Sequence, residues 1–346
     1  MRTFKLIATL FVVSILSAGV AKAEEKQKEY HESWPVSEVS ALQISNKFGE
    51  IRINNDGGSE VTIDVTITVE AANERKADEL LDMINVEFGK SGSTVKAETS
   101  IENNFKSQRK FSIDYVVNIP SDKNLKIDNK YGNTVVNSLT ADGIFEIKYG
   151  NFTANELLTP NGGNLSLDLK YGNGSIGEAT NLVAEVGYSP LTIEELKTLK
   201  LESKYSTIEV EEGSDILIES KYDKLSFGEV STVDATTKYS NLKIDELAKS
   251  LKIESGYGGV QVGEVNDDFD FITITNSYGQ ISLGLDDASY EVEASCRYCG
   301  ISYPEDEFSG NRIKENNTFE IKGKVGTLAG GKVYVKSQYG EIKLRD

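Results

Sequence analysis

A short sequence unit recurs from Tyr131 to Tyr278 and constrains the fold of this chain more than any other feature. The unit takes forms such as IDNKYGNTVVNSL, LESKYSTIEVEEG and IESKYDKLSFGEV, each centred on a tyrosine. Four successive steps between these tyrosines are 17 residues long, and the others are 18 to 22. Such a period is typical of architectures in which one supersecondary unit stacks on the next. The central tyrosines are Tyr131, Tyr149, Tyr171, Tyr188, Tyr205, Tyr222, Tyr239, Tyr257 and Tyr278.

Apolar residues alternate with polar ones on both sides of each central tyrosine. Around Tyr205, Leu199 and Leu201 precede the ring at positions −6 and −4, and Ile208 and Val210 follow it at +3 and +5. Alternation with a period of two indicates strands with one buried face. A unit this short cannot bury that face by itself, so the units must stack and share a core.

The alternation shifts by one residue just after the tyrosine, which predicts a corner between two strands. Glycine often follows the tyrosine and would supply the backbone freedom that a corner needs. Examples are Gly132, Gly150, Gly172 and Gly258. We therefore predict an all-β fold, a single parallel β-solenoid with rungs about 4.8 Å apart.

The N-terminus has the features of a targeting segment. Arg2 and Lys5 precede an apolar run, and Ala21-Lys22-Ala23 is a small-x-small cleavage sequence. This pattern predicts a secretory signal peptide over residues 1–23, cut before Glu24, with an uncleaved anchor as the alternative. No later stretch is long enough to span a bilayer as a helix. Residues 24–37 are polar and are predicted to be a disordered linker.

Residues 38–120 differ from the regular repeats. Ala41–Asn54 forms one unit with Phe48 in the tyrosine position, but the next centre is Tyr131. Between them we predict strands at 61–69, 86–88, 94–99 and 111–119 and a helix at 72–84, which Asn73 would cap. This strand–helix–strand insertion is predicted to cap the open first rung, because an uncovered rung exposes unpaired backbone groups.

The repeats extend from 121 to the C-terminal residue, 346, but they loosen after Tyr278. Tyr298 and Tyr339 still centre recognisable units, 41 residues apart. Between them, Pro304–Asn317 is polar and rich in turn-forming residues, whereas Phe319–Val325 and Lys332–Val335 are predicted strands.

These features together resemble the bacterial putative-adhesin β-strand-repeat family. The resemblance rests on the signal peptide, the NKFGEIRI unit, the insertion, the junction IDYVVNIPSDKNLKIDNKYGN and the serial KYGN units. It covers nearly the whole mature chain. It implies a secreted or surface-associated β-helical protein, and it brings no catalytic residues with it.

A column of glutamates occupies the outward position +7 of seven consecutive units. Like charges one rung apart repel by about 0.9 kcal/mol even in water. The side chains are therefore expected either to splay into solvent or to lie near a divalent cation that they bind weakly. No calcium-loop motif is present, so no defined metal site is predicted. The column is Glu156, Glu178, Glu195, Glu212, Glu229, Glu246 and Glu264.

Two further charged columns precede the tyrosines. Acidic residues recur at position −3 and lysines at −1, on the outer face of one strand, where they can pair. The two interpretations are a solvated face that discourages edge pairing and a charged strip that binds a ligand. The lysines are Lys130, Lys148, Lys170, Lys204, Lys221 and Lys238.

Cys296 and Cys299 flank Tyr298 in the sequence CRYC. In an exported chain this spacing favours a disulfide that pins the corner, with free thiols or a redox pair as alternatives. Zinc would need more ligands than these two cysteines and the remote His31 provide.

The tyrosine column itself has two interpretations. Parity places the rings on the same face as the −4 and −6 aliphatic residues, which predicts packing inside or at the corner. The alternative is an outward row of rings on which carbohydrate could stack.

Net charge and motif content limit the function. A formal net charge of −18, which becomes −21 when the basic signal peptide is removed, argues against nucleic acid and anionic lipid as partners. No catalytic residue, metal or cofactor is predicted. We expect a non-catalytic binding or structural protein of the periplasm or cell surface, with an envelope protein or a glycan as its partner. The alternative is a polysaccharide-active β-helix enzyme, for which only the acids and bases within Pro304–Asn317 are candidates.

Overall fold

The computed structural model describes residues 24–346 except 56–57, 161, 287, 328–329 and 346. The predicted signal peptide lies outside the described residues. In the part that is described, the fold is mostly β, with 70% strand and one α-helix, in a large mixed sheet that is largely parallel. The predicted all-β class and parallel pairing are confirmed at that level. The chain divides into two compact units, residues 1–173 and 174–346.

The first unit contains fourteen of the elements that the structure describes. They are β1 (Glu24–Pro35), the 3-10 turn η1 (Val36–Glu38), β2 (Ala41–Lys47), β3 (Ile51–Asn54), β4 (Glu60–Ala71), α1 (Glu74–Asp82), β5 (Ile84–Ser91), β6 (Thr94–Ile101), β7 (Phe111–Asn118), β8 (Asn124–Lys130), β9 (Thr134–Leu139), β10 (Gly143–Lys148), β11 (Phe152–Leu157) and β12 (Leu165–Lys170).

Two columns of parallel strands organise this unit. One runs in the order β6, β2, β8, β10, β12 and the other in the order β7, β3, β9, β11. The strands around Phe48 (β2 and β3) pair directly with those around Tyr131 (β8 and β9). The insertion separates the two pairs of strands in the sequence but does not interrupt their pairing. Its strands β6 and β7 pair with β2 and β3 on the side away from β8 and β9.

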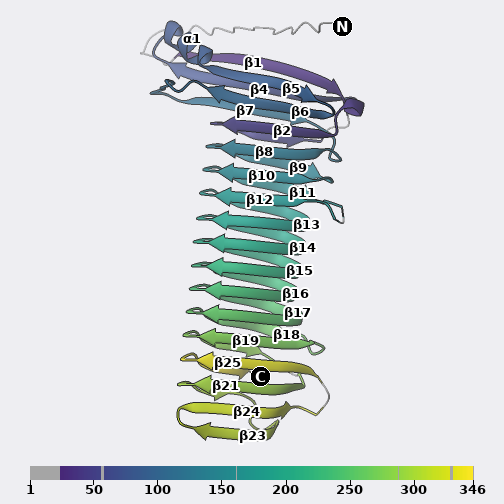
Figure 1. The fold of residues 1–346 in the computed structure, drawn as a ribbon, viewed down its shortest axis with the longest axis vertical. Helices are drawn as coiled ribbons and strands as arrows, with labels where there is room; N and C mark the ends of the chain where they lie inside the picture. Colours follow the sequence, from purple (N-terminus) through teal and green to yellow (C-terminus); the bar gives the residue numbers. More distant parts are fainter. Residues whose placement is uncertain (1–23, 56–57, 161, 287, 328–329, 346) are drawn as a thin grey trace. The chain divides into compact units, whose positions relative to one another are not determined.

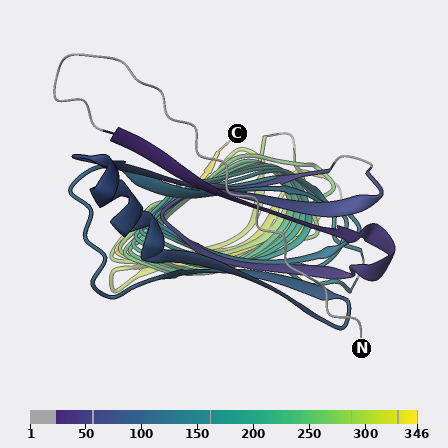
Figure 2. The ribbon, with the colours of Figure 1, turned by 90° about the horizontal axis from the view of Figure 1, so that it is seen from above.

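The insertion also supplies an antiparallel cap. β4 pairs with β7, and β5 pairs with β6. The helix α1 contacts β1, β4 and β5 and lies between the two columns at one edge (Figure 2). Asn73 caps it as predicted, since its Oδ1 accepts from the Lys76 N–H at 3.0 Å. Ala77, Leu80 and Leu81 are buried, but Ile84 begins β5, so the predicted helix is too long at its C-terminus.

The prediction of a disordered linker over 24–37 is wrong. Residues Glu24–Pro35 form β1, which pairs antiparallel with β4 along its whole length. The Tyr30 ring lies 6.1 Å from that of Phe88, and Lys26 Nζ lies 2.8 Å from Glu74 of α1. A polar segment is ordered here because the backbone groups along the β4 edge need partners, which composition does not reveal.

The second unit contains the remaining strands. They are β13 (Gly174–Gly187), β14 (Pro190–Lys204), β15 (Thr207–Lys221), β16 (Lys224–Lys238), β17 (Asn241–Gly256), β18 (Val260–Val265), β19 (Phe271–Ser277), β20 (Ile281–Gly284), β21 (Tyr290–Arg297), β22 (Ile301–Ser302), β23 (Phe308–Glu315), β24 (Thr318–Val325), β25 (Gly331–Gln338) and β26 (Ile342–Arg345).

Strands β13 to β17 are long and pair in parallel with their predicted register, one beside the next (Figure 1). The +3 aliphatic residues Leu191, Ile208, Leu225 and Leu242 face one another on successive strands and are buried. The predicted inside face is thus confirmed for the aliphatic positions.

The C-terminal strands do not follow sequence order. β25 pairs in parallel with both β19 and β21, so the last full strand of the chain lies between two earlier ones. β26 likewise pairs with both β20 and β22. On its other side β21 pairs antiparallel with β24, and β24 with β23. The segment Pro304–Asn317, predicted to be irregular, therefore contains a strand of a terminal hairpin.

Candidate functional site

The central aromatic residue of each unit has a left-handed backbone. Its φ lies between 54° and 65° from Phe48 to Tyr339. The predicted role of the glycines is therefore wrong. A Cβ on Gly132 would lie 1.9 Å from the carbonyl oxygen of Gly49, and one on Gly150 would lie 1.9 Å from that of Gly132. Glycine is needed because successive rungs approach closely at the corner, whereas the aromatic residue itself takes the unusual conformation.

This conformation turns the rings outward. The central tyrosines are 46–53% exposed, so the predicted internal position is wrong, whereas the predicted packing at the corner is confirmed. Parity along a strand holds only while every residue is extended, and one left-handed residue reverses the direction of its side chain.

The exposed rings form a continuous stack within each unit, which we call the tyrosine ladder. Centroids of neighbouring rings are 4.7–5.0 Å apart and their planes differ by at most 15°. In residues 1–173 the order is Phe48, Tyr131, Tyr149, Tyr171. In residues 174–346 it is Tyr188, Tyr205, Tyr222, Tyr239, Tyr257, Tyr278, Tyr339, Tyr298.

The ladder leaves no ring face free inside the stack. Each inner ring is covered on both sides by its neighbours. Phe111 lies 5.0 Å from Phe48, and the guanidinium of Arg297 lies 5.3 Å from the ring of Tyr298. A sugar that stacks on an aromatic ring needs a free face, so the ladder does not fit the predicted alternative of a carbohydrate-stacking platform.

The structure aligns six of the seven predicted column glutamates. Glu178, Glu195, Glu212, Glu229, Glu246 and Glu264 face one another on successive strands from β13 to β18. Glu156 lies in the other unit, on β11, where it faces Ser138. The sequence register alone predicts this column, because parallel strands with equal spacing place equal positions side by side.

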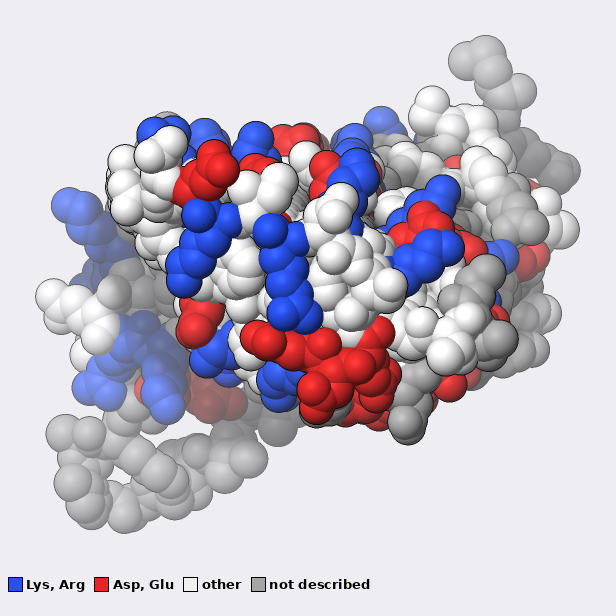
Figure 3. Space-filling model, turned by 90° about the horizontal axis from the view of Figure 1, so that it is seen from below, with Lys and Arg blue, Asp and Glu red and all other residues white. Residues whose placement is uncertain are grey.

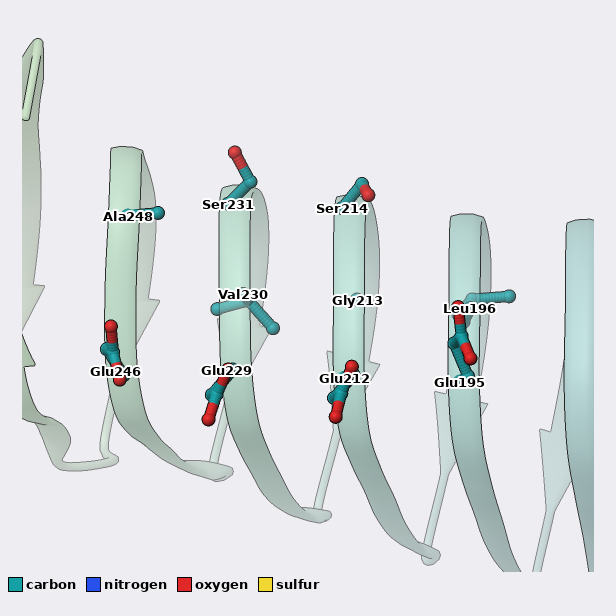
Figure 4. A pocket seen from close by; sticks show the side chains of 10 residues that line it. All are labelled: Glu195, Leu196, Glu212, Gly213, Ser214, Glu229, Val230, Ser231, Glu246 and Ala248. Atoms are coloured by element: carbon teal, nitrogen blue, oxygen red, sulfur yellow. The ribbon is translucent and has the colours of Figure 1, made fainter.

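Four of these glutamates line a groove of about 250 Å³. Glu195, Glu212, Glu229 and Glu246 lie in a row, one on each strand from β14 to β17 (Figure 4). Gly213 has no side chain to fill the floor, and Ser214 and Ser231 lie along the opposite wall.

The groove is electronegative. None of its four glutamates forms an ion pair with any residue that the structure describes. On the face drawn in Figure 3, the largest group of acidic side chains lies at the lower centre, and smaller acidic groups lie among the basic side chains. The described residues include no group of three or more His, Cys, Asp or Glu side chains that could hold a metal ion. The carboxylates thus form an open row rather than a converging ligand set.

Sequence reasoning missed a buried carboxylate at the corner after Tyr222. Asp223 is only 5% exposed and accepts hydrogen bonds from the hydroxyls of Ser203 and Ser220 at 2.7 and 2.6 Å. The N–H groups of Ser206 and Lys221 donate to it at 2.7 and 3.2 Å. These four donors replace the water that the charge loses on burial. The available signal was an acid at +1, where the other units carry glycine or serine, or a cysteine in the unit of Tyr298.

The two cysteines occupy the same pair of positions as Ser220 and Asp223, at −2 and +1. Cys296 and Cys299 form a disulfide across the corner after β21, with Cα atoms 5.5 Å apart. At the other corner, Ser220 donates a hydrogen bond to Asp223 at 2.6 Å. The disulfide thus links covalently the two positions that Ser220 and Asp223 link by a hydrogen bond at another corner of the same unit.

In the exported protein we expect Cys296 and Cys299 to be oxidised, because they are placed within bridging distance in a chain predicted to enter an oxidising compartment. Mass spectrometry of the unreduced peptide that carries both residues should find it lighter by two hydrogen atoms than the reduced peptide. Recovery of two thiols that alkylate without reduction, in protein taken from the periplasm, would contradict this expectation.

The residues considered for an enzyme belong to the terminal hairpin. Arg312 Nη1 lies 3.4 Å from Glu305 Oε2, and its guanidinium lies 5.3 and 5.2 Å from the rings of Tyr303 and Phe308. Burial raises the pKa of the Tyr303 phenol above its ordinary value. These contacts pack the hairpin against the rung of β21 and β22, so Glu305 and Arg312 already have a structural role.

The chain matches no family model and no curated protein. Several solved structures resemble it. One is described as a "putative cell adhesion protein" from Clostridium sporogenes; it shares 8% identity with a TM-score of 0.21, and the match covers 92% of this chain and 99% of the other. Two are from Parabacteroides distasonis. A "putative adhesin" has 14% identity and a TM-score of 0.30, and covers 74% and 93% of the two chains. A "putative lipid binding protein" shares 11% identity with a TM-score of 0.36, and the match covers 74% of this chain and 96% of the other.

The resemblance to proteins described as adhesins therefore extends over most of the chain. Likenesses at these identities and TM-scores assign no ligand or activity to it. Among the described residues, no helical segment has both the length and the apolar character needed to cross a bilayer.

Proposed function

We propose that this protein is an exported, non-catalytic β-solenoid that offers a repetitive surface for binding or structural support at the cell envelope, in the periplasm or on the cell surface. The register of the parallel strands supports the solenoid, because each rung places the same sequence positions beside those of the next. The predicted signal peptide supports export.

The row of four glutamates in one groove is the observation that carries this proposal. Equal groups on consecutive rungs provide several equivalent contacts, each of them weak because it is exposed to solvent. The partner would be a positively charged part of an envelope protein or a set of loosely bound divalent cations. It would gain affinity by contacting several rungs at once. An enzyme needs the opposite, a few unlike groups that converge on one reacting atom.

Substitution of the glutamates by glutamine should therefore act in a graded way. We expect Glu195→Gln, Glu212→Gln, Glu229→Gln and Glu246→Gln to change binding to a native envelope fraction by less than about twofold each. Together they should weaken it by about tenfold or more, because contacts on several rungs are lost at once. The measurements are envelope pull-down and the shift of the melting temperature by calcium.

A matched control removes four other exposed acids from the same strands: Glu202, Glu209, Glu219 and Glu254, each changed to glutamine. This variant has the same net charge as the groove variant and should retain binding. An equal loss of binding in both variants would show that the net charge of the protein, and not the groove, determines binding. A hydrolytic or lyase activity that one substitution abolishes would favour the polysaccharide-active enzyme instead.

A further inference from the structure

The tyrosine ladder presents only the rims of its rings to solvent. An aromatic ring is electrostatically negative on its faces and positive at its edge. Because the faces cover one another at 4.9 Å in the stack of Tyr205, Tyr222 and Tyr239, the exposed surface consists of ring edges and phenol hydroxyls. Within the described residues, these three hydroxyls form no hydrogen bond. The outer surface of the ladder is therefore a row of free donors on a weakly positive rim.

A column of cations borders the ladder. The residue just before the central aromatic residue is basic in eight rungs and is never acidic in the described repeats. A column of basic residues is unusual in a chain whose formal net charge is −18. The basic residues are Lys47, Lys130, Lys148 and Lys170 in residues 1–173, and Lys204, Lys221, Lys238 and Arg297 in residues 174–346.

Three of the four border lysines of the first unit form ion pairs with the acidic column. Lys130 Nζ lies 3.5 Å from Asp128, and Lys148 and Lys170 lie 3.6 and 3.0 Å from Asp168. These lysines are already engaged, so this part of the border has a structural explanation.

The second unit leaves its border lysines unpaired. Lys204, Lys221 and Lys238 face one another on β14, β15 and β16, and all three are exposed. Among the described residues, none of their ammonium groups has a carboxylate oxygen within 4.0 Å, although Glu202 and Glu219 stand two positions before Lys204 and Lys221 on β14 and β15. Three ammonium groups and three phenol hydroxyls thus share one strip with a repeat of 4.9 Å.

We propose that this strip, made of Lys204, Tyr205, Lys221, Tyr222, Lys238 and Tyr239, binds a linear acidic polysaccharide that lies along the ladder. The proposal rests on the proposed function as a binding surface and names a second site, separate from the acidic groove, and its ligand class. Lysine ammonium groups pair with the carboxylates of the glycan, while the phenol hydroxyls donate to carboxylate and hydroxyl oxygens.

The strip selects a long ligand. Each exposed ion pair contributes little and is screened by salt, so one carboxylate is not held. A chain with an acidic group on every sugar meets successive rungs and gains from their combination.

Other polyanions fit the strip less well. Single-stranded nucleic acid binds such proteins by stacking its bases on free aromatic faces, and the ladder has none in this stretch.

Titration of the mature protein with polygalacturonate tests the proposal by calorimetry at low ionic strength. We expect binding that weakens as salt is added. We expect none with fully methyl-esterified polygalacturonate, which has the same backbone without the charge. The triple variant K204Q/K221Q/K238Q should bind about tenfold more weakly. The triple variant Y205F/Y222F/Y239F, which keeps the stacked rings and removes only the hydroxyls, should lose about threefold.

The control variant K200Q/K243Q/K252Q removes three exposed lysines that lie away from the ladder, one on β14 and two on β17. It should bind within about twofold of the unchanged protein. Cooperative thermal unfolding of every variant shows that the fold is kept. The four-glutamine groove variant should still bind polygalacturonate, so failure of the groove proposal and failure of this one are separable.

Four results would overturn the proposal: no binding at low salt, equal loss in the control variant, equal binding of the methyl ester, or tighter binding of polyuridylate or of anionic vesicles than of polygalacturonate.

Discussion

Leu242→Asp is expected to destabilise residues 174–346 by about 4 kcal/mol or more. Leu242 is 2% exposed and packs between the equivalent residues of the neighbouring rungs, Leu225 and Val260. A carboxylate there would lose its water without gaining a partner, and the cavity left by the shorter side chain would add to the cost. Chemical denaturation at neutral pH measures the change in the free energy of unfolding.

Lys243→Asp is the matched control, since it introduces the same side chain one position further along β17. Lys243 is exposed and pairs with Asp245 at 2.6 Å. Loss of that surface pair and a new repulsion should cost no more than about 1 kcal/mol. Equal losses for the two variants would show that the assignment of inner and outer faces along β17 is wrong.

Deletion of the rung that comes last in the sequence, β25 and β26, should be strongly destabilising. The neighbouring strands should no longer unfold cooperatively. Val333, Val335, Ile342 and Leu344 are buried, and their burial corresponds to about 6–12 kcal/mol of transfer free energy. That is comparable to the entire stability of a typical domain. β19 and β21 would also lose the partner that each has on one side.

Hydrogen exchange distinguishes this arrangement from a stack in sequence order. In the structure, alternate amides of β21 face β25 and the others face β24, so the deletion should expose the first set to rapid exchange. If the last rung lay at the end of the stack instead, β21 would pair with β19 and stay protected after the deletion. The variant Ile313→Ser, on the exposed strand β23, serves as the control and should change stability by less than about 0.5 kcal/mol.

Local regularity made the repeats predictable from the sequence. Apolar residues at fixed offsets from each tyrosine predicted both the strands and their inner face, and Leu225 and Leu242 are buried accordingly. Equal spacing also predicted that Glu195, Glu212, Glu229 and Glu246 would align. Both follow because the side-chain period of a strand and the register of parallel strands are fixed by the backbone.

Candidate binding features were predictable only as columns. The sequence shows that lysines precede the tyrosines, but not that Lys148 pairs with Asp168 while Lys204 and Lys221 stay unpaired. Those differences depend on rotamers and on distances between rungs, which a pattern of residue types does not contain.

The sequence by itself determined that this chain forms corner-linked parallel strands with an aliphatic core, an inserted cap with one capped helix, and aligned columns of charge. The tertiary structure alone decided three things. Tyr205 and its equivalents point outward because one left-handed residue reverses parity at each corner. Glu24–Pro35 is a strand because the edge of β4 needs backbone partners. The last rung lies between two earlier ones because strand pairing depends on which edges are open in space, and sequence order does not record that.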